Sequence, residues 1–378
     1  MRAAVYLDQA FWQEDGEIYA ARSFVLFLGE LAKHFDELTV TARLSPEPAG
    51  SHYRLPPPAQ FAPLPHYGSA ARPLTVIRAG RESAARFAEL LDRVDVVWLL
   101  GPHPFALRFA RMAARRGKRV VLGVRQDLPR YVGNRHPRRP DLRLVAAALD
   151  LSFRRLARRF PAIVVGPDLA KRYRAACRLL EIYVSLIAAA DLVPPVERPA
   201  RDYGDRVRML SVGRLDAEKN PLMLVDVLDR LEPRFELTVC GDGPLEGQLA
   251  NRVARHDLGA RVEMRGHVPM GEELIGLYRD SDLLLHVSWT EGVPQVLLES
   301  FAAALPVVAT AVGGVAEAAK GAALLIPPGD PDAAAAAVRR IAESSDLRAQ
   351  LLSAGHAIAE AHTVEAEAGR VAEFLRGR

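Results

Sequence analysis

Short apolar runs alternate with longer amphipathic stretches from one end of the chain to the other. The apolar runs are rich in Val, Ile and Leu, and continuous rather than alternating hydrophobicity is typical of strands buried on both faces. We expect strands at 2–7, 37–42, 94–100, 118–124, 161–166, 207–213, 235–241, 262–267, 282–288 and 305–310. We expect helices at 104–117, 142–160, 220–231, 244–255 and 294–304, followed by a tail that is helical throughout. This alternation predicts an α/β fold, with parallel sheets covered by helices.

A proline-rich, charged stretch, AAADLVPPVERPARDYG at 188–204, interrupts the pattern just past the middle of the chain. Such a composition is typical of an exposed linker between domains. We therefore expect two doubly wound domains, at 1–187 and 205–362, with a last helix at about 363–378 that packs back on the first. Ligands of doubly wound sheets bind at the carboxyl ends of the strands, so the cleft between the domains is the expected site.

The totals fit this division. The chain has 378 residues, of which 49% are hydrophobic and 25% charged, as in a soluble globular protein with two cores. No apolar run reaches the length of a membrane span, and MRAAVYLDQAFW is too short and polar for a signal peptide. The two cysteines, Cys177 and Cys240, match no disulfide framework or metal spacing. We expect a cytoplasmic protein.

Charge is spread unevenly along the chain. The net charge is only +4, yet residues 101–200 hold 21 Lys and Arg against 7 Asp and Glu. This excess suggests an anionic partner, either a nucleic acid, a membrane surface or a phosphorylated small molecule; arginines on solvated helix faces are the alternative. The arginines lack interleaved aromatic residues, which argues against nucleic acid. The segment at 144–160 could lie peripherally on the inner face of an anionic membrane, or could be a core helix with a basic outer face.

The second half carries distinctive turns after consecutive strands. Neither G-x-G-x-x-G nor the P-loop pattern G-x-x-x-x-G-K-[ST] is present. Instead, the expected strands are followed by VGRLDAEKN, CGDGP, RGHVP and SWTEGVPQVLLES. Because parallel neighbouring strands end at the same edge of a sheet, we expect these turns to line one edge.

Two of the turns bring charges to that edge. Arg214 and Lys219 precede a helix N-terminus, where the helix dipole disfavours positive charge, so either a strongly negative ligand binds there or both side chains point into solvent. Glu291 precedes Glu299 by eight residues, and Pro294 opens a helix whose first amides could receive an anion.

These features together resemble glycosyltransferase family 4, a group of retaining, nucleotide-sugar-dependent enzymes with the GT-B fold. The resemblance rests on E-x7-E ahead of ALPVVATAVGGVAE, on VGRL with a lysine five residues after its arginine, and on LLIPPGD. It is dense from Val207 to Pro328 and thinner before that. It implies two Rossmann-like domains facing across a cleft, the first binding the acceptor and the second the nucleotide sugar, with no cofactor and no metal.

The resemblance also implies roles for individual residues. Arg214 and Lys219 would hold the donor diphosphate, Glu291 would hydrogen-bond the sugar, and Glu299 would accept bonds from the ribose. Further donor contacts would come from Gly213, Gly241, Gly243, His267, Val268, Gly292, Val293, Gln295 and Val296. Pro294 stands where a glycine is commoner in the family, a departure that would reshape the sugar pocket.

The N-terminal half departs further from the family pattern. Members often carry two glycines after the first strand, whereas QEDGEIYAARS offers only Gly16 as a donor contact. Many carry a histidine after the strand at 118–124, where this chain has Arg125 and Gln126 as the residues that would contact the sugar or acceptor. Asp127 could contact the acceptor or could be a local cap. The DSD at 280–282 reads as a turn rather than a metal site.

The sequence therefore favours a retaining hexosyltransferase that uses a UDP- or GDP-sugar and needs no metal. The acceptor would be a hydroxyl of a glycan, a lipid-linked precursor or a natural product. A nucleotide-sugar epimerase, a phosphorylase and a non-enzymatic sugar-nucleotide binding protein on the same fold remain alternatives.

Overall fold

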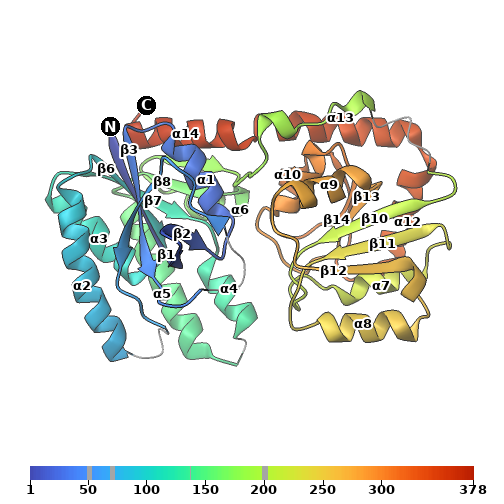
Figure 1. Ribbon diagram of the computed structural model, residues 1–378, viewed down its shortest axis with the longest axis horizontal. Coiled ribbons are helices and arrows are strands. Elements are labelled where there is room, and N and C mark those ends of the chain that lie inside the picture. Colours follow the sequence, from blue (N-terminus) through green and yellow to red (C-terminus); the bar gives the residue numbers. More distant parts are fainter. Residues whose placement is uncertain (49–52, 69–72, 137, 198–202) are drawn as a thin grey trace. The chain divides into compact units, whose positions relative to one another are not determined.

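The computed structural model describes residues 1–48, 53–68, 73–136, 138–197 and 203–378. The chain divides into two compact units (Figure 1). The first comprises Met1–Leu186 together with Val364–Arg378, and the second comprises Ile187–Thr363.

The first unit is built on a parallel sheet. Its central strands run in the order β5-β3-β1-β6-β7-β8-β9, each parallel to its neighbours. The order therefore reverses between β1 and β6, as in doubly wound folds. The strands are β1 (Arg2–Glu14), β3 (Glu37–Leu44), β5 (Gln60–Leu64), β6 (Val96–Gly101), β7 (Arg119–Val124), β8 (Ala162–Val165) and β9 (Leu179–Ile182).

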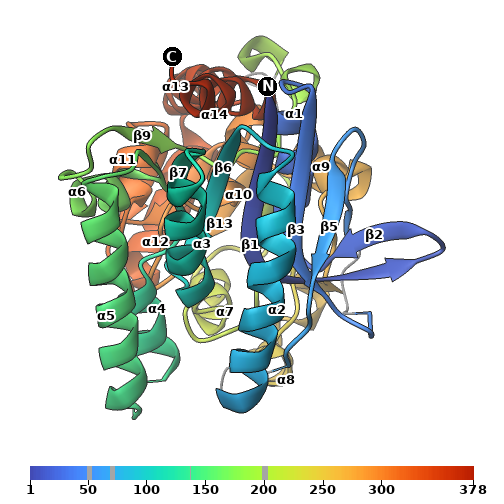
Figure 2. The same cartoon turned by 90° about the vertical axis from the view of Figure 1, so that its left-hand side faces the viewer.

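A β-hairpin extends the first unit where the sequence predicted only parallel strands. The strand β2 (Glu17–Ala20) pairs antiparallel with the end of β1, and β4 (Tyr53–Arg54) pairs antiparallel with β2 (Figure 2). The turn between β1 and β2 is Asp15-Gly16, with φ of 50° and 82°. Asp-Gly with two positive φ values favours a tight hairpin, and this local chemistry overrides the expectation of an all-parallel sheet.

Helices cover both faces of this sheet. α1 (Phe24–Ala32) and α14 (Val364–Arg376) pack together on one face. On the other, α2 (Pro73–Leu91), α3 (Pro104–Arg115) and α5 (Pro140–Ala157) enclose an apolar core. Two short helices, α4 (Leu128–Arg135) and α6 (Pro167–Arg172), follow β7 and β8. The C-terminal helix thus belongs to the first unit.

The second unit has a six-stranded sheet that is parallel throughout, as the sequence predicted. The order is β12-β11-β10-β13-β14-β15, so it reverses between β10 and β13. The strands are β10 (Val207–Val212), β11 (Phe235–Cys240), β12 (Val262–Gly266), β13 (Leu283–His286), β14 (Val307–Thr310) and β15 (Ala323–Ile326).

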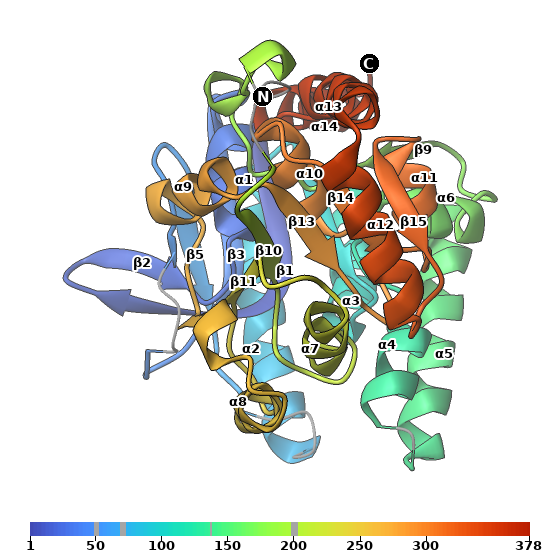
Figure 3. The same cartoon turned by 90° about the vertical axis from the view of Figure 1, so that its right-hand side faces the viewer.

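The helices of the second unit again form two layers (Figure 3). One layer holds α7 (Leu222–Asp229), α8 (Glu246–Arg255) and α12 (Pro331–Glu343). The other holds α9 (Glu272–Asp280), α10 (Gln295–Ala302) and α13 (Ser345–Ala361), and the short α11 (Val315–Ala319) follows β14.

The expected linker at 188–204 lies within the second unit, apart from 198–202, which fall outside the described residues. It contains two short 3-10 turns, Ala189–Asp191 and Pro195–Glu197. Tyr203 is buried in the core of the unit, and its hydroxyl donates to the carbonyl of Asp282 at 2.7 Å. The second unit therefore begins before residue 205.

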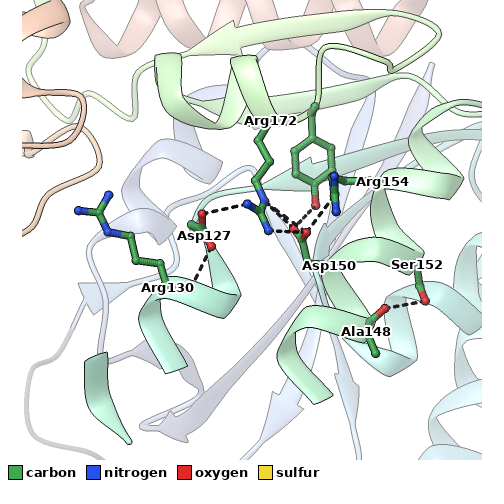
Figure 4. A network of polar contacts seen from close by, with 8 residues as sticks. Asp127, Arg130, Ala148, Asp150, Ser152, Arg154 and Arg172 are labelled. Carbon is green, nitrogen blue, oxygen red and sulfur yellow. Dashed lines mark hydrogen bonds and ion pairs between the residues drawn. The ribbon is translucent and has the colours of Figure 1, made fainter. Parts of the chain in front are cut away.

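A buried carboxylate fixes the helices that follow β7 and β8. Asp150, on α5, is almost wholly buried and accepts hydrogen bonds from Arg154 at 2.9 Å, Arg172 at 2.7 Å and the hydroxyl of Tyr173 at 3.2 Å (Figure 4). Burial and the nearby carboxylate raise the pKa of Tyr173, so its hydroxyl remains a donor. Because Arg172 is on α6, the network ties α6 to α5.

We expect Asp150→Asn to lower the free energy of unfolding of the whole chain by about 1–3 kcal/mol, because an amide offers one acceptor oxygen where three donors converge. Chemical denaturation followed by circular dichroism measures the change. Asp141→Asn is the matched control, since Asp141 lies on the same helix and pairs with Arg139 in solvent, and it should leave stability unchanged. Equal losses in both variants would contradict a special role for the buried network.

Candidate functional site

The strand reversal in the second unit creates a pocket. β10 and β13 are neighbours, and their carboxyl ends lie at Val212 and His286. Ligands of open α/β sheets bind where the strand order reverses, because the loops leave the two strands in opposite directions. The pocket at this point is lined by Ser211, Val212, Gly213, Arg214, Leu215, Lys219, Pro221, Leu224, Val239, His286, Val287 and Ser288.

Two of the predicted turns are bonded to each other through their backbones. The amide of Gly213 donates to Cys240 at 2.9 Å, and the amide of Leu215 donates to Asp242 at 2.7 Å. A Cβ on Gly241 would lie 1.9 Å from the carbonyl oxygen of Gly213, and one on Gly243 would lie 2.6 Å from that of Leu215. Glycine is therefore required at Gly241 and Gly243 by the approach of the neighbouring turn.

The two predicted site residues of opposite charge form an ion pair. Lys219 Nζ lies 2.5 Å from Glu291 Oε1, and His286 Nε2 lies 3.0 Å from the same oxygen. Glu291 has only 7% of its side chain exposed. Burial raises the pKa of this carboxyl, but the opposing effects of His286 and of the charge of Lys219 are larger and bring the pKa down to about 2. Glu291 is therefore ionised throughout the physiological range.

Arg214 also has carboxylate partners, both within its own turn. Its guanidinium lies 2.5 Å from Asp216 and 3.5 Å from Glu218, and more than half of the side chain is exposed. The amide of Trp289 donates to the carbonyl of Glu218 at 2.8 Å, which joins this turn to the loop after β13. The two cations are therefore balanced by acidic side chains at the same edge of the sheet.

The loop that carries Glu291 is supported from behind by the turn after β14. Gly314 donates its amide to the carbonyl of Gly292 at 3.1 Å. A Cβ on Gly313, whose φ is 52°, would lie 1.9 Å from the carbonyl oxygen of Glu291. The glycine pair in AVGGVAE therefore fixes the backbone of Glu291.

Glu299 is buried rather than exposed. It lies on α10 with 6% of its surface accessible, and it accepts a 2.6 Å hydrogen bond from the hydroxyl of Tyr278 on α9. Burial raises the pKa of Glu299 to about 7, although the bond from Tyr278 opposes that rise. The carboxyl consequently changes charge near neutral pH.

The remaining donor-site candidates lie on the loop into α10 and the loop after β12. Pro294 is the N-cap of α10, and no side chain of the described residues caps this helix end. Gly292 is exposed and Val293, Gln295 and Val296 are half-buried. After β12, His267 is exposed and Val268 is buried.

The first-unit candidates lie in two places, the β1–β2 turn and the segment between β7 and α4. Gly16 is in the exposed β1–β2 turn, so its positive φ already accounts for a glycine there. Arg125 stacks on the ring of Phe24 at 3.7 Å, and burial together with Arg22 lowers the pKa of Arg125 to about 10, which leaves it charged at neutral pH. Gln126 beside it is exposed.

Asp127 is engaged as a cap. Its Oδ1 accepts the amide of Arg130 at 3.0 Å at the start of α4, and its Oδ2 lies 3.5 Å from Arg172 (Figure 4). The structure thus gives it the cap that the sequence analysis offered as an alternative to an acceptor contact.

The DSD segment has the geometry of a turn. Asp282 accepts the amide of Arg208 at 2.7 Å and its guanidinium at 3.3 Å, and the hydroxyl of Ser281 donates to Leu277 at 2.7 Å. Across the described ranges, no group of three or more His, Cys, Asp and Glu is arranged to hold a metal ion.

The sequence analysis missed His286 and Tyr278, which contact Glu291 and Glu299. The one available signal for His286 was its position as the last residue of the apolar strand DLLLH, at the edge where ligands bind. Tyr278 lies on a different helix from its partner, and no local pattern connects the two.

Comparison with known proteins shows a similarity in the C-terminal half of the chain. Residues 197–357 match the model of "Glycosyl transferases group 1". The amylovoran biosynthesis glycosyltransferase AmsK of Erwinia amylovora is 33% identical over 148 residues, 36% of each chain. The D-inositol 3-phosphate glycosyltransferase of Corynebacterium jeikeium is 32% identical over 199 residues, 45% of this chain and 47% of that one. The matches thus span less than half the length of these curated relatives.

Solved structures match over the whole chain, at lower identity. Anabaena Alr3699/HepE in complex with UDP aligns with 100% of both chains at a TM-score of 0.69 and 18% identity. WaaG, a glycosyltransferase involved in lipopolysaccharide biosynthesis, aligns with 100% of both at 0.70 and 16%. These likenesses show the GT-B fold. Residues 197–357 are thus similar to the group 1 glycosyl transferases, and the chain has the GT-B fold.

Proposed function

We propose that the chain is a glycosyltransferase that moves a hexose from a nucleoside-diphosphate sugar to an acceptor hydroxyl. The observation that carries the proposal is the pocket between β10 and β13, which is lined by Arg214 and by Lys219, the partner of the ionised Glu291. The similar Alr3699/HepE structures hold UDP and UDP-glucose, which supports a uridine diphosphate donor. The relatives named as glycosyltransferases favour transfer over epimerisation or simple binding.

The diphosphate is assigned to Arg214 and Lys219. Each cation can donate charge-assisted hydrogen bonds to phosphate oxygens, and the N-terminus of α10 supplies a favourable dipole. Glu291 is assigned to the sugar hydroxyls, because an ionised carboxylate accepts hydrogen bonds from them. Glu299, in its charged form, would accept the ribose hydroxyls.

We assign retention of the anomeric configuration to the reaction. An inverting enzyme needs a general base on the face of the sugar opposite the leaving group. Asp127, the carboxylate that the sequence analysis offered as an acceptor contact, is engaged by Arg130 and Arg172. A front-face substitution, in which the departing phosphate takes the acceptor proton, needs no such base. Positioning and charge stabilisation by the two cations would then provide the catalysis, with no metal.

Peripheral membrane contact is a second proposal, and it rests on α5. Leu144 is 75% exposed, and Val145 and Leu151 are exposed on the same helix. Arg143, Arg154 and Arg155 also lie on it, and apolar and basic side chains together favour an anionic lipid surface. Across the ranges that the structure describes, every helix is too short or too polar to span a bilayer.

We expect Arg214→Ala to weaken UDP binding by roughly 1.5–3 kcal/mol, about ten- to a hundredfold, because one charge-assisted interaction is lost. Isothermal titration calorimetry measures the dissociation constant. Arg206→Ala is the matched control, since Arg206 lies just before the opposite end of β10 and pairs with Glu236. If the two variants bind UDP equally well, the diphosphate assignment to Arg214 is wrong.

We expect UDP binding to strengthen as the pH rises through about 7, because Glu299 then becomes a carboxylate that accepts ribose hydroxyls. Glu299→Gln should remove this pH dependence and bind as weakly at pH 8 as the parent does at pH 6. The free energy of unfolding changes with pH in the opposite direction. A raised pKa in the folded state stabilises the fold below the unfolded value, and this contribution is lost as the pH approaches 7. Titration of UDP into both proteins across this range provides the test, and parallel pH profiles would exclude the ribose role.

We expect Leu144→Ser combined with Val145→Ser to reduce binding to vesicles that contain an anionic phospholipid, since the replaced side chains are apolar and solvent-exposed. Vesicle co-sedimentation measures the bound fraction. The exposed Val196, in the second unit, supplies the control as Val196→Ser, which should bind as the parent does. Undiminished binding of the double variant would remove α5 from the contact.

A further inference from the structure

The first unit carries a polar cluster at its own strand reversal. β1 and β6 are neighbours there, and the cluster joins Asp8, after the regularly paired part of β1, to His103, just after β6. The sequence analysis assigned nothing to these residues. Their position matches that of the pocket between β10 and β13 in the second unit, because ligands bind where strand order reverses.

A bulge in β1 presents Asp8. The pairing of β1 with β3 runs in register to Tyr6–Thr41 and resumes at Ala10–Arg43, so three residues of β1 lie opposite one of β3. Bulges of this kind re-aim side chains and are frequent beside functional sites. Here the irregular segment is Leu7 to Gln9, with Asp8 at its centre.

Three donors from three other elements converge on Asp8. The hydroxyl of Tyr67 donates to Oδ1 at 2.5 Å, and Arg43 Nε lies 3.0 Å from the same oxygen. His103 Nε2 lies 3.3 Å from Oδ2. A quarter of the Asp8 side chain remains exposed, as does 22% of His103, so solvent reaches both groups.

The contacts of His103 fix its tautomer. Its Nδ1 accepts the amide of Phe105 at 3.3 Å and lies 2.9 Å from the hydroxyl of Tyr6. Burial raises the pKa of Tyr6, so that hydroxyl keeps its proton and donates. Burial also lowers the pKa of His103, which is neutral with its remaining proton on Nε2, facing Asp8.

The charges of this cluster cancel, which indicates the kind of ligand it binds. Asp8 and Arg43 neutralise each other and His103 is neutral. A cluster without net charge offers a phosphate no net attraction, whereas a hydroxyl can donate to Asp8 and accept from His103 or Arg43 at once. We propose that Asp8, Arg43, Tyr67 and His103 bind an uncharged, hydroxyl-bearing group, a carbohydrate or polyol, of the acceptor. This inference rests on the proposed function.

Saturation-transfer NMR on the full chain without nucleotide tests the proposal. The probes are methyl α-D-glucopyranoside, the corresponding galactoside and mannoside, and glucose 6-phosphate. We expect at least one methyl glycoside to give a signal with the parent protein, and glucose 6-phosphate to give none. Asp8→Asn should weaken that binding about tenfold, because a charge-assisted acceptor is lost.

Asp95→Asn is the matched control. Asp95 lies just before the opposite end of the same strand, β6, where it accepts the amide of Arg2 at 2.7 Å, and the variant should bind the glycosides as the parent does. Tyr67→Phe, which removes one donor and keeps the ring, should give an intermediate loss. Thermal melting followed by circular dichroism verifies that each variant is folded.

The proposal is overturned if no methyl glycoside binds the parent, if Asp8→Asn and Tyr67→Phe both bind as the parent does, or if glucose 6-phosphate binds more tightly than the neutral sugars. A separate titration with UDP keeps this outcome distinct from the proposed function. UDP binding with no effect of Asp8→Asn on glycosides removes only the acceptor site. Absence of binding to UDP and UDP-glucose would remove the donor assignment on which both rest.

Discussion

The reversal of strand order in each parallel sheet is the constraint on which the functional geometry depends. A parallel strand must be followed by a crossover, and crossovers that leave neighbouring strands in opposite directions open a space between their loops. In the second unit this space lies between β10 and β13, and in the first it lies between β1 and β6. In the second unit Arg214 follows β10 and Glu291 follows β13, and in the first unit Asp8 lies in the later part of β1 and His103 follows β6.

Within the second unit, ion pairs hold the charged side chains at the carboxyl edge of the sheet in place. Lys219 and Glu291 are held together with His286, and Arg214 is held by Asp216 and Glu218. A buried ion pair costs desolvation and adds little to stability by itself, so its value lies in holding both groups in place. If a diphosphate binds Lys219 and breaks its ion pair with Glu291, His286 is still in contact with Glu291. The buried carboxylate therefore keeps a partner.

The features that could be predicted are those that depend on residues close together in the sequence. Most strands and helices of the second unit, its parallel sheet and the turns with Arg214 and Lys219 follow from local pattern and spacing, whereas β15 and α9 were not among the expected elements. The hairpin at Gly16 was missed because Asp15-Gly16 was not recognised as a tight turn. Its two positive φ values end the strand pattern of β1 and reverse the chain. Asp8 and His103 could not be found, because their pairing depends on the bulge in β1 and on a strand many residues further along the chain.

Two glycines that were predicted as donor contacts have a structural explanation instead. A glycine after a strand suggests a ligand that needs close approach to the backbone, and the sequence analysis assigned Gly241 and Gly243 to donor binding. In the structure the close neighbour of each is the turn that carries Gly213 and Leu215, and a Cβ at either position would meet a carbonyl oxygen. Their requirement is thus accounted for by packing between turns, and it carries no information on a ligand. The charged groups beside them are different, because no packing requirement explains two cations and an ionised glutamate at the edge of one sheet.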